Sequence, residues 1–178
     1  MFILDYQTPE KATDGVAKIY DFFVNKRSPV PAPLQLLSAS PGLLQLQFDQ
    51  IGYFASHQAL SFPLLAAIRF LAAQETCYDH CTNLNRTWLS KTGLSAQDLT
   101  DLAEGKNVEA FSEAENSLLA VVAKMLRKEK ITEAEIQQLR SLGWNDSDVL
   151  DACSQGANLI AHSYLYSAFS REAAPESS

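Results

Sequence analysis

The residues best suited to chemistry lie in one short stretch of the chain, where Cys77 and Cys81 are four positions apart and His80 directly precedes Cys81. A cysteine thiolate is a strong nucleophile, and an imidazole within reach can accept the thiol proton. A second thiol can then trap the sulfenic acid that forms on oxidation as a disulfide. These three side chains are the minimum set for a thiol peroxidase or a disulfide reductase.

A helix is expected to position these residues, because Thr76 can act as its N-cap with Asp79 at the third position of a short capping box. Cys77 would then lie in the first turn, where unpaired backbone N–H groups and the helix dipole lower the pKa of a thiol. Cys81 and Asn85 follow at intervals of four residues and share one face of this helix. A disulfide between cysteines a full turn apart requires local adjustment of that turn.

Two other interpretations of the cysteines stay open. Cysteine is among the most buried residue types, so two of them on a helix stripe can simply be packing residues. A zinc or iron site built on Cys77, His80 and Cys81 would need a distant fourth ligand and has no standard ligand spacing. We therefore expect no metal and no other cofactor. Cys153 lies on the apolar stripe of the last expected helix and is expected in the core.

Three further polar residues, two histidines and an arginine, lie at positions where a hydrogen-bond or ion-pair partner is expected. His57 follows the second expected helix and could be a ligand or a base, although a surface or helix-end histidine is the commoner case. His162 is near the stripe of the last helix and could approach the cysteines, or be a satisfied core histidine. Arg69 lies inside an apolar helix and must find a carboxylate or a carbonyl partner.

Composition limits the classes of function. The 178 residues have 47% hydrophobic and 20% charged side chains and a formal net charge of -7. This balance predicts one globular domain over residues 1–178, and the acidic charge argues against a nucleic-acid partner. The most apolar window, residues 64–73, contains an arginine and is too short to span a bilayer, so no membrane partner is expected. Three cysteines and a start without a basic leader segment favour a reducing, cytoplasmic location.

The apolar spacing and the helix start signals predict an all-α domain of about seven or eight helices. Proline-containing starts are expected at Thr8, Ser40 and Ser61, and the proline-rich residues 25–33 are expected to form a loop. Residues 64–72 are apolar nearly all round, which indicates a central buried helix. Further starts, most of them capping boxes, follow at Ser95, Ser112, Thr132 and Asn145. The last helix has the apolar stripe Leu150, Cys153, Ala157, Ile160, Tyr164 and Ala168, and residues 172–178 are expected to fray.

Several of these segments occur in the order of a known family. The apolar helix Leu64–Ala72, the segment Cys77–Asn85 and the segment Gly93–Leu99 are followed by helical segments at 111–126 and 132–168. Together they resemble the AhpD-like / carboxymuconolactone decarboxylase family over residues 40–171. The resemblance implies an all-α AhpD-like fold, a thiol-dependent alkyl hydroperoxide reductase and a homo-oligomer, either a dimer, a trimer or a hexamer.

The resemblance also implies roles for single residues. Cys81 takes the place of the cysteine that attacks peroxide, Cys77 that of the resolving cysteine, and His80 that of a base beside the thiol. The pair departs from the family spacing, because the family has CxxC and this chain has CxxxC. Asn85 stands where the family has its relay histidine, and an amide cannot act as a base near neutral pH.

The upstream acid of the family relay is also absent. Its place falls at residues 64–66, which hold no carboxylate, and the nearest acid, Glu75, is out of register. Asn85, Glu75 and Arg69 are therefore expected only to support the cysteines.

The leading hypothesis is an AhpD-like, peroxidase-related protein that acts on a small peroxide and takes electrons from a thiol reductant, with weak or modified activity. A non-catalytic oligomeric or small-ligand-binding protein, whose cysteines are packing residues, is the alternative. Decarboxylation of a cyclic lactone acid ranks last, because only Arg69 and Arg86 are near enough to hold a carboxylate.

Overall fold

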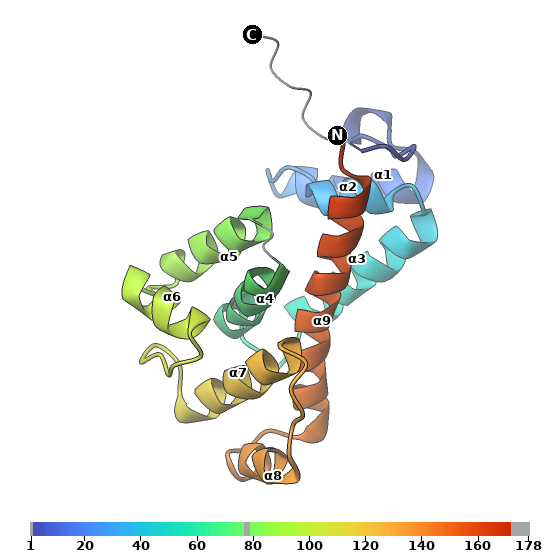
Figure 1. Ribbon diagram of the computed structural model, residues 1–178. Helices are drawn as coiled ribbons and strands as arrows, with labels where there is room; N and C mark the ends of the chain where they lie inside the picture. Colours follow the sequence, from blue (N-terminus) through green and yellow to red (C-terminus); the bar gives the residue numbers. More distant parts are fainter. Residues whose placement is uncertain (1, 77–78, 172–178) are drawn as a thin grey trace. The chain divides into compact units, whose positions relative to one another are not determined.

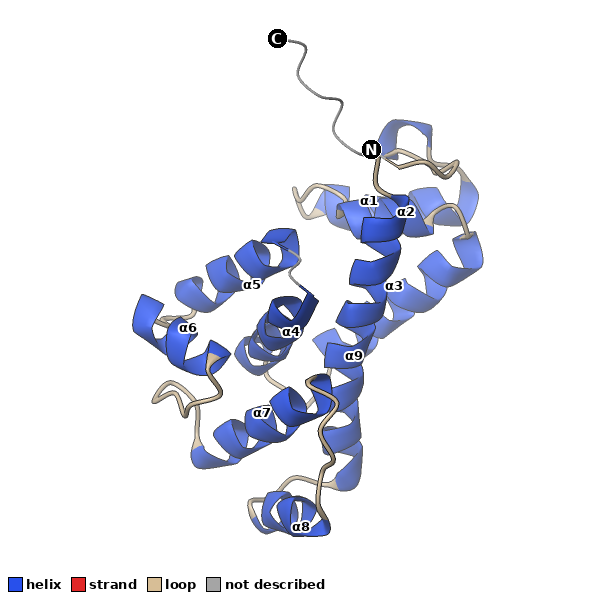
Figure 2. Cartoon of the chain, in the orientation of Figure 1, coloured by secondary structure: helices blue, strands red, loops and turns tan. Residues whose placement is uncertain are grey.

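The computed structural model describes residues 2–76 and 79–171, and the side chains of these residues except 79–81. Over this part of the chain the backbone forms nine α-helices, one of them only six residues long, and a short 3-10 helix (Figure 1). The only β pairing described is an isolated bridge between Phe2 and Ser170, and no strand is drawn in Figure 2. The predicted all-α class is confirmed, with slightly more helices than expected.

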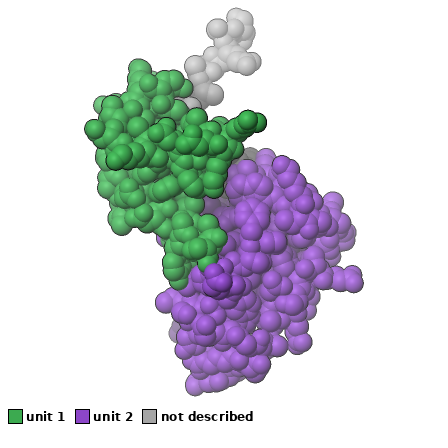
Figure 3. Space-filling view, turned by 180° about the vertical axis from the view of Figure 1, so that it is seen from behind, with its two compact units in different colours: residues 1–56, 164–178 green, residues 57–163 purple. Residues whose placement is uncertain are grey.

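The chain divides into two compact units, coloured separately in Figure 3. The first unit contains residues 1–56 and 164–178, and the second contains residues 57–163. The last helix, α9 (Asp146–Phe169), supplies residues to both units. The expectation of one domain over the whole chain stays a prediction.

The first unit contains η1 (Pro9–Lys11), α1 (Asp14–Asn25), α2 (Ala32–Leu37) and α3 (Pro41–Ala55). The prediction of a helix from Thr8 was wrong, because the proline start gives only the 3-10 turn η1 and the α-helix begins after Thr13. The proline-rich loop is also shorter than predicted, since α2 begins at Ala32 and Pro33 fits in its first turn, where no helical N–H is needed. The buried core of this unit consists of Val16, Ile19, Tyr20, Val30, Leu34 and Leu44.

The second unit is built around α4 (Phe62–Thr76), which begins next to Ser61 as predicted. Nine of its fifteen residues are buried, which confirms a central helix that is apolar nearly all round. Helix α4 packs against α5 (Asp79–Lys91), α6 (Ala96–Ala103) and α7 (Glu113–Leu126), and Figure 1 shows it lying between α5 and α7. Helix α8 (Glu133–Ser141) packs against α7 and precedes α9.

Three predicted capping boxes are confirmed, at the starts of α6, α7 and α8. In each, the cap hydroxyl accepts from the backbone N–H three residues on, and that residue's carboxylate accepts from the backbone N–H of the cap. At the start of α9, the Asn145 side-chain oxygen accepts from the backbone N–H of Asp148 at 2.9 Å. Local sequence alone therefore specifies where these four helices begin.

The box at α8 predicts a pH-dependent contribution to stability. Its carboxylate, Glu135, accepts from Lys124 Nζ at 2.7 Å and from both the backbone and the hydroxyl of Thr132. These hydrogen bonds, with Lys124 the largest cause, lower the pKa of Glu135 to about 2. The Glu135 carboxylate therefore contributes fully to the free energy of unfolding above its pKa in the unfolded chain, near 4.3. This contribution is lost as the pH falls towards 2.

We expect Glu135→Gln to melt at a lower temperature than the wild type at pH 7, with the difference closing between pH 4.5 and pH 2. Thermal unfolding followed by circular dichroism measures this. Glu113→Gln, which removes an exposed first-turn carboxylate of α7, is the matched control. A Glu135→Gln deficit that is unchanged at pH 2 would contradict the assigned hydrogen bonds.

The apolar stripe predicted for α9 is only partly buried. Leu150 is 70% exposed and Tyr164 is 62% exposed, while Ala157 and Ala168 are also exposed. Small residues instead face the second unit's core: a Cβ added at Gly156 would lie 3.1 Å from Leu126 Cδ2. Helix α9 approaches its neighbours so closely there that its small-residue face, and not its large apolar stripe, is buried. No helix among residues 2–76 and 79–171 is long and apolar enough to cross a bilayer.

Candidate functional site

Residues 77–78, which separate α4 from α5 in the sequence, lie outside the described residues, so the predicted cap at Thr76 stays a prediction. Thr76 is the last residue of α4, where its hydroxyl donates to the carbonyl of Ala73 at 3.2 Å, and α5 begins at Asp79. The Thr76 hydroxyl thus bonds back within α4. Cys77 lies outside the described residues, so its predicted place in the first turn of α5 stays a prediction.

This start places His80 and Cys81 at the second and third positions of α5. The backbone N–H groups of a first helical turn have no partner within the helix, and the positive end of the dipole favours an anion there. Among the described residues of α5, Cys81 therefore lies in the first turn. The side chains of both residues lie outside those described.

One turn further along α5, Asn85 is buried, with only 2% of its surface exposed. Its side-chain oxygen accepts a hydrogen bond from Arg69 Nε on α4 at 3.1 Å. Arg69 is half-buried in the middle of this apolar helix, so it needs such a polar partner. The predicted carbonyl partner of Arg69 is thus an amide carbonyl, supplied by the residue at the relay-histidine place.

Two aromatic rings flank the same guanidinium. The central carbon of Arg69 lies 5.3 Å from the centroid of the Trp88 ring and 5.8 Å from that of the Phe62 ring. The two rings meet edge to face with centroids 5.7 Å apart. The two distances from the guanidinium carbon to the rings are within the range of cation–π attraction. This cluster was not predicted from the sequence. The spacing carried a signal for it, because Phe62 and Arg69 are seven residues apart on α4 and Asn85 and Trp88 are three apart on α5, so each pair lies on one face of its helix.

The remaining candidates lie elsewhere or have other uses. Glu75 is exposed in the last turn of α4. Cys153 is half-buried, and burial raises the pKa of its thiol, so it stays protonated near neutral pH. Burial lowers the pKa of the half-buried His162, so this imidazole is neutral near pH 7.

His57 binds through both ring nitrogens. Its Nδ1 accepts from the backbone N–H groups of Ala59 and Leu60, at 3.2 and 3.0 Å. Because Nδ1 is an acceptor, the ring proton is assigned to Nε2, which donates to Asp151 Oδ2 at 3.2 Å and lies 4.0 Å from Asp148 Oδ1. His57 therefore ties the start of the second unit to α9, a structural use that fits a helix-end histidine.

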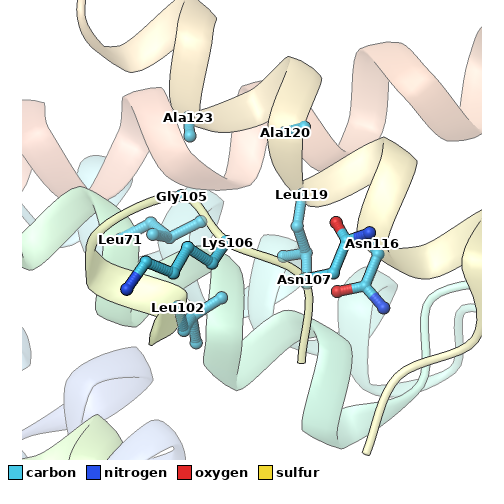
Figure 4. Close-up of a pocket in the computed structure, with 9 residues that line it drawn as sticks. All are labelled: Leu71, Leu102, Gly105, Lys106, Asn107, Asn116, Leu119, Ala120 and Ala123. Carbon is cyan, nitrogen blue, oxygen red and sulfur yellow. The ribbon is translucent and has the colours of Figure 1, made fainter. Parts of the chain in front are cut away.

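The described side chains offer no ligand cluster for a metal ion, and a pocket in this part of the chain lies away from the expected site residues. The side chains described there contain no group of three His, Cys, Asp or Glu residues that could hold a metal ion. A pocket with about 240 Å³ of empty space, part of it open to solvent, is lined by Leu71 of α4, Leu102 of α6, the loop residues 105–107 and residues of α7 (Figure 4). Its one charged residue, Lys106, is paired with Asp101 and Glu104, and none of the expected site residues lines it.

Neither a family model nor a curated protein sequence matches this chain. Several solved structures, however, match this chain in fold. A peroxidase-related protein from Silicibacter sp. TM1040 is 20% identical with a TM-score of 0.76, over 94% of this chain and 88% of that one. An alkylhydroperoxidase AhpD-core, peroxidase-related protein from Ralstonia eutropha JMP134 is 14% identical with a TM-score of 0.76, over 93% and 88%. The chain has the AhpD-like fold.

This agreement confirms the predicted resemblance at the level of the fold. A third solved structure is a cysteine-to-alanine variant of the debrominase Bmp8 in complex with 2,3,4-tribromopyrrole, which is 11% identical with a TM-score of 0.73, over 94% of this chain and 89% of that one. Proteins named for peroxidases and for a debrominase thus share this fold. The fold alone therefore does not identify the reaction.

Proposed function

We propose that this AhpD-like protein is a thiol-dependent oxidoreductase that reduces hydroperoxides, with Cys81 as the nucleophile. The observation that supports the proposal is that Cys81 lies in the first described turn of α5 (Asp79–Lys91). Unpaired N–H groups and the helix dipole favour a thiolate there, and a thiolate is the form that attacks peroxide. Cys77, four residues earlier, is the resolving thiol of the proposal.

The proposed reaction has three steps. The Cys81 thiolate attacks one oxygen of ROOH, the O–O bond breaks, and the products are a Cys81 sulfenic acid and an alkoxide that takes a proton to become ROH. The Cys77 thiol then attacks the Cys81 sulfur, which forms a disulfide and releases water. An external thiol reductant supplies two electrons and two protons to return the disulfide to two thiols.

His80 is the proton carrier of the proposal. It directly precedes Cys81, and an imidazole is the side chain best matched to proton transfer near neutral pH. Asn85 cannot take this role, because an amide is no base and its oxygen accepts from Arg69. Because Asn85 stands where the family has its relay histidine, we expect slower peroxide turnover than in a protein that has this histidine.

Thiol counting tests the proposal. One equivalent of an alkyl hydroperoxide, added to the reduced full-length protein, should remove two of its three native thiols, and a dithiol reductant should restore them. A protein that keeps all three thiols under these conditions would overturn the proposal. If the thiols also stay unreactive until denaturation, the non-catalytic, ligand-binding alternative is the better explanation.

We also propose that the protein self-associates through α3. Leu43, Leu46 and Tyr53 lie at positions i, i+3 and i+10 of this helix and are 53%, 67% and 52% exposed. Large apolar side chains exposed along one helix face mark an interaction surface, and a second copy of the chain is the proposed partner.

Leu46→Glu should shift the protein towards monomer, at least about tenfold in the dissociation constant, because it places a charge in an apolar contact. Analytical ultracentrifugation over a range of protein concentrations measures this. Gln45→Glu adds the same charge at another exposed position of α3 and should have little effect. A wild type that is monomeric throughout the range would disprove the association.

A further inference from the structure

We infer that helix α9 is a self-association surface, whose exposed side forms an antiparallel helix pair with α9 of a second copy of the chain. The inference does not depend on the thiol chemistry of the proposed function. It adds a contact to the one proposed for α3 and uses other residues, so the two contacts can be tested separately.

One side of α9 (Asp146–Phe169) has the spacing of a coiled-coil seam. Seven uncharged residues follow one another at alternating intervals of three and four positions. They are Ser147, Leu150, Ser154, Ala157, Ala161, Tyr164 and Ala168, which we call the α9 seam. Residues at these intervals form one row along a helix, and in a coiled coil this row packs against a second helix.

The α9 seam faces away from the side that α9 buries. Six of its seven residues are exposed and Ser154 is half-buried, and the large apolar side chains Leu150 and Tyr164 are 70% and 62% exposed. At about 100° per residue, the buried residues of α9 lie on the opposite side of the helix. These are Asp148, Val149, Ala152, Gly156 and Ser163. The seam is therefore not used for packing within a single copy of the chain.

The exposed side of α9 also lacks the charges that a solvent-facing helix normally has. From Ala152 to Ser170 the chain contains no Asp, Glu, Lys or Arg. A helix side that meets only water is usually rich in charged and polar residues. A continuous uncharged side with a large apolar residue towards each end therefore indicates a surface that a partner covers.

The order of large and small side chains fits a second copy in antiparallel orientation. In one register, Leu150 of each copy lies opposite Ala168 of the other, and Tyr164 lies opposite Ser154. Each large side chain then faces a small one, so the two rows can interdigitate. The centre of the seam has only small residues, which lets the two helix axes approach to about 8 Å.

A parallel pair fits less well. It sets Leu150 against Leu150 and Tyr164 against Tyr164, which holds the helices apart and leaves Ala157 and Ala161 with few contacts between them. Side chains that face empty space lose their dispersion contacts. The seam is thus complementary to its own reverse, as a contact between two identical chains related by a two-fold axis requires.

Charge favours the same orientation. The first two turns of α9 contain Asp146, Asp148 and Asp151, whereas Arg171 follows the last turn. An antiparallel pair brings Arg171 of each copy towards the acidic end of the other, whereas a parallel pair brings the two acidic ends together. Asp146 also pairs with Arg140 of its own chain, so this attraction selects the orientation more than it adds affinity.

Analytical ultracentrifugation of the full-length chain over a range of concentrations tests the contact. The starting protein is the Leu46→Glu chain, which lacks the α3 contact and should still associate through α9. Adding Leu150→Glu should raise its dissociation constant at least about tenfold, because it places a charge in an apolar contact. Because Leu150 is exposed, the fold should be kept, which the circular dichroism spectrum checks. Gln137→Glu, which adds the same charge at an exposed position of α8, is the matched control and should have little effect.

Cysteines placed at facing positions test the orientation. Leu150→Cys and Ala168→Cys are made in separate full-length chains whose three native cysteines are replaced by serine. On oxidation with diamide, neither chain alone should form a disulfide-linked dimer, and a mixture of the two should form one that contains one chain of each kind. A parallel pair would link each chain to itself. Should the serine-substituted chain fail to fold, the ultracentrifugation experiment still decides the inference, because it retains the native cysteines.

The outcomes for α9 and α3 are distinct. A Leu46→Glu chain that is monomeric at every concentration would overturn the inference and leave the α3 contact standing. An unchanged dissociation constant after Leu150→Glu, or a disulfide-linked dimer of Leu150→Cys alone, would overturn it as well. Association that survives Leu46→Glu and is weakened by Leu150→Glu supports it.

Discussion

Replacing the Cys81 sulfur by oxygen in Cys81→Ser should lower the rate of hydroperoxide consumption at least about a hundredfold, because a serine hydroxyl does not ionise near neutral pH and cannot form a sulfenic acid. The position of residue 81 in the first turn of α5 is unchanged by this substitution, so the loss reports chemistry. Peroxide consumption with an excess of a thiol reductant, followed by loss of the peroxide itself, is the measurement.

The other two cysteines supply the controls. Cys153→Ser should leave the rate unchanged, because Cys153 is half-buried and burial raises the pKa of its thiol. Cys77→Ser should still react once and stop at a sulfenic acid on Cys81, which a dimedone probe would label. Wild-type turnover in Cys81→Ser, or a dimedone label on Cys77 in that variant, would show that the roles are reversed or absent.

Much of the fold was predictable because its signals are local. The boxes Ser95–Asp98, Ser112–Glu115 and Thr132–Glu135 each satisfy backbone groups within four residues, so no distant contact can easily override them. The burial of α4 was predictable for a different reason. A helix that is apolar nearly all round has no face that favours solvent, and any compact arrangement must cover it.

The start of the site helix was not predictable in this way. Thr76 can cap a following helix or end a preceding one, and the residues around it allow both. The apolar run of α4 continues to Ala73, and the Thr76 hydroxyl then bonds back to that residue's carbonyl at 3.2 Å. The described residues of α5 begin at Asp79, so Cys81 lies in its first described turn.

Side-chain contacts between different helices could not be predicted from the sequence either. Arg69 and Asn85 are 16 residues apart on different helices, and only the packing of α4 on α5 brings Nε and Oδ1 to 3.1 Å. The sequence predicted that Arg69 needs a polar partner and could not say which. For α9, the pattern of large apolar residues predicted the wrong buried face, because the close approach at Gly156 decides it.

The packing of α4 carries the second large prediction. Phe70 is fully buried in this helix, and Phe70→Ala should lower the free energy of unfolding by about 3–5 kcal/mol, through lost apolar burial and the cavity that it leaves. Domains of this size are stable by about 5–15 kcal/mol, so the loss is a large share of the total. Urea denaturation followed by circular dichroism measures it, with an unchanged slope as the sign that the same surface unfolds.

Phe62→Ala is the matched control, because it deletes the same side chain from the same helix at a position that is 53% exposed. Its ring contacts Trp88 edge to face, so we expect a loss of about 1 kcal/mol. Equal losses for the two variants would contradict the central place of α4.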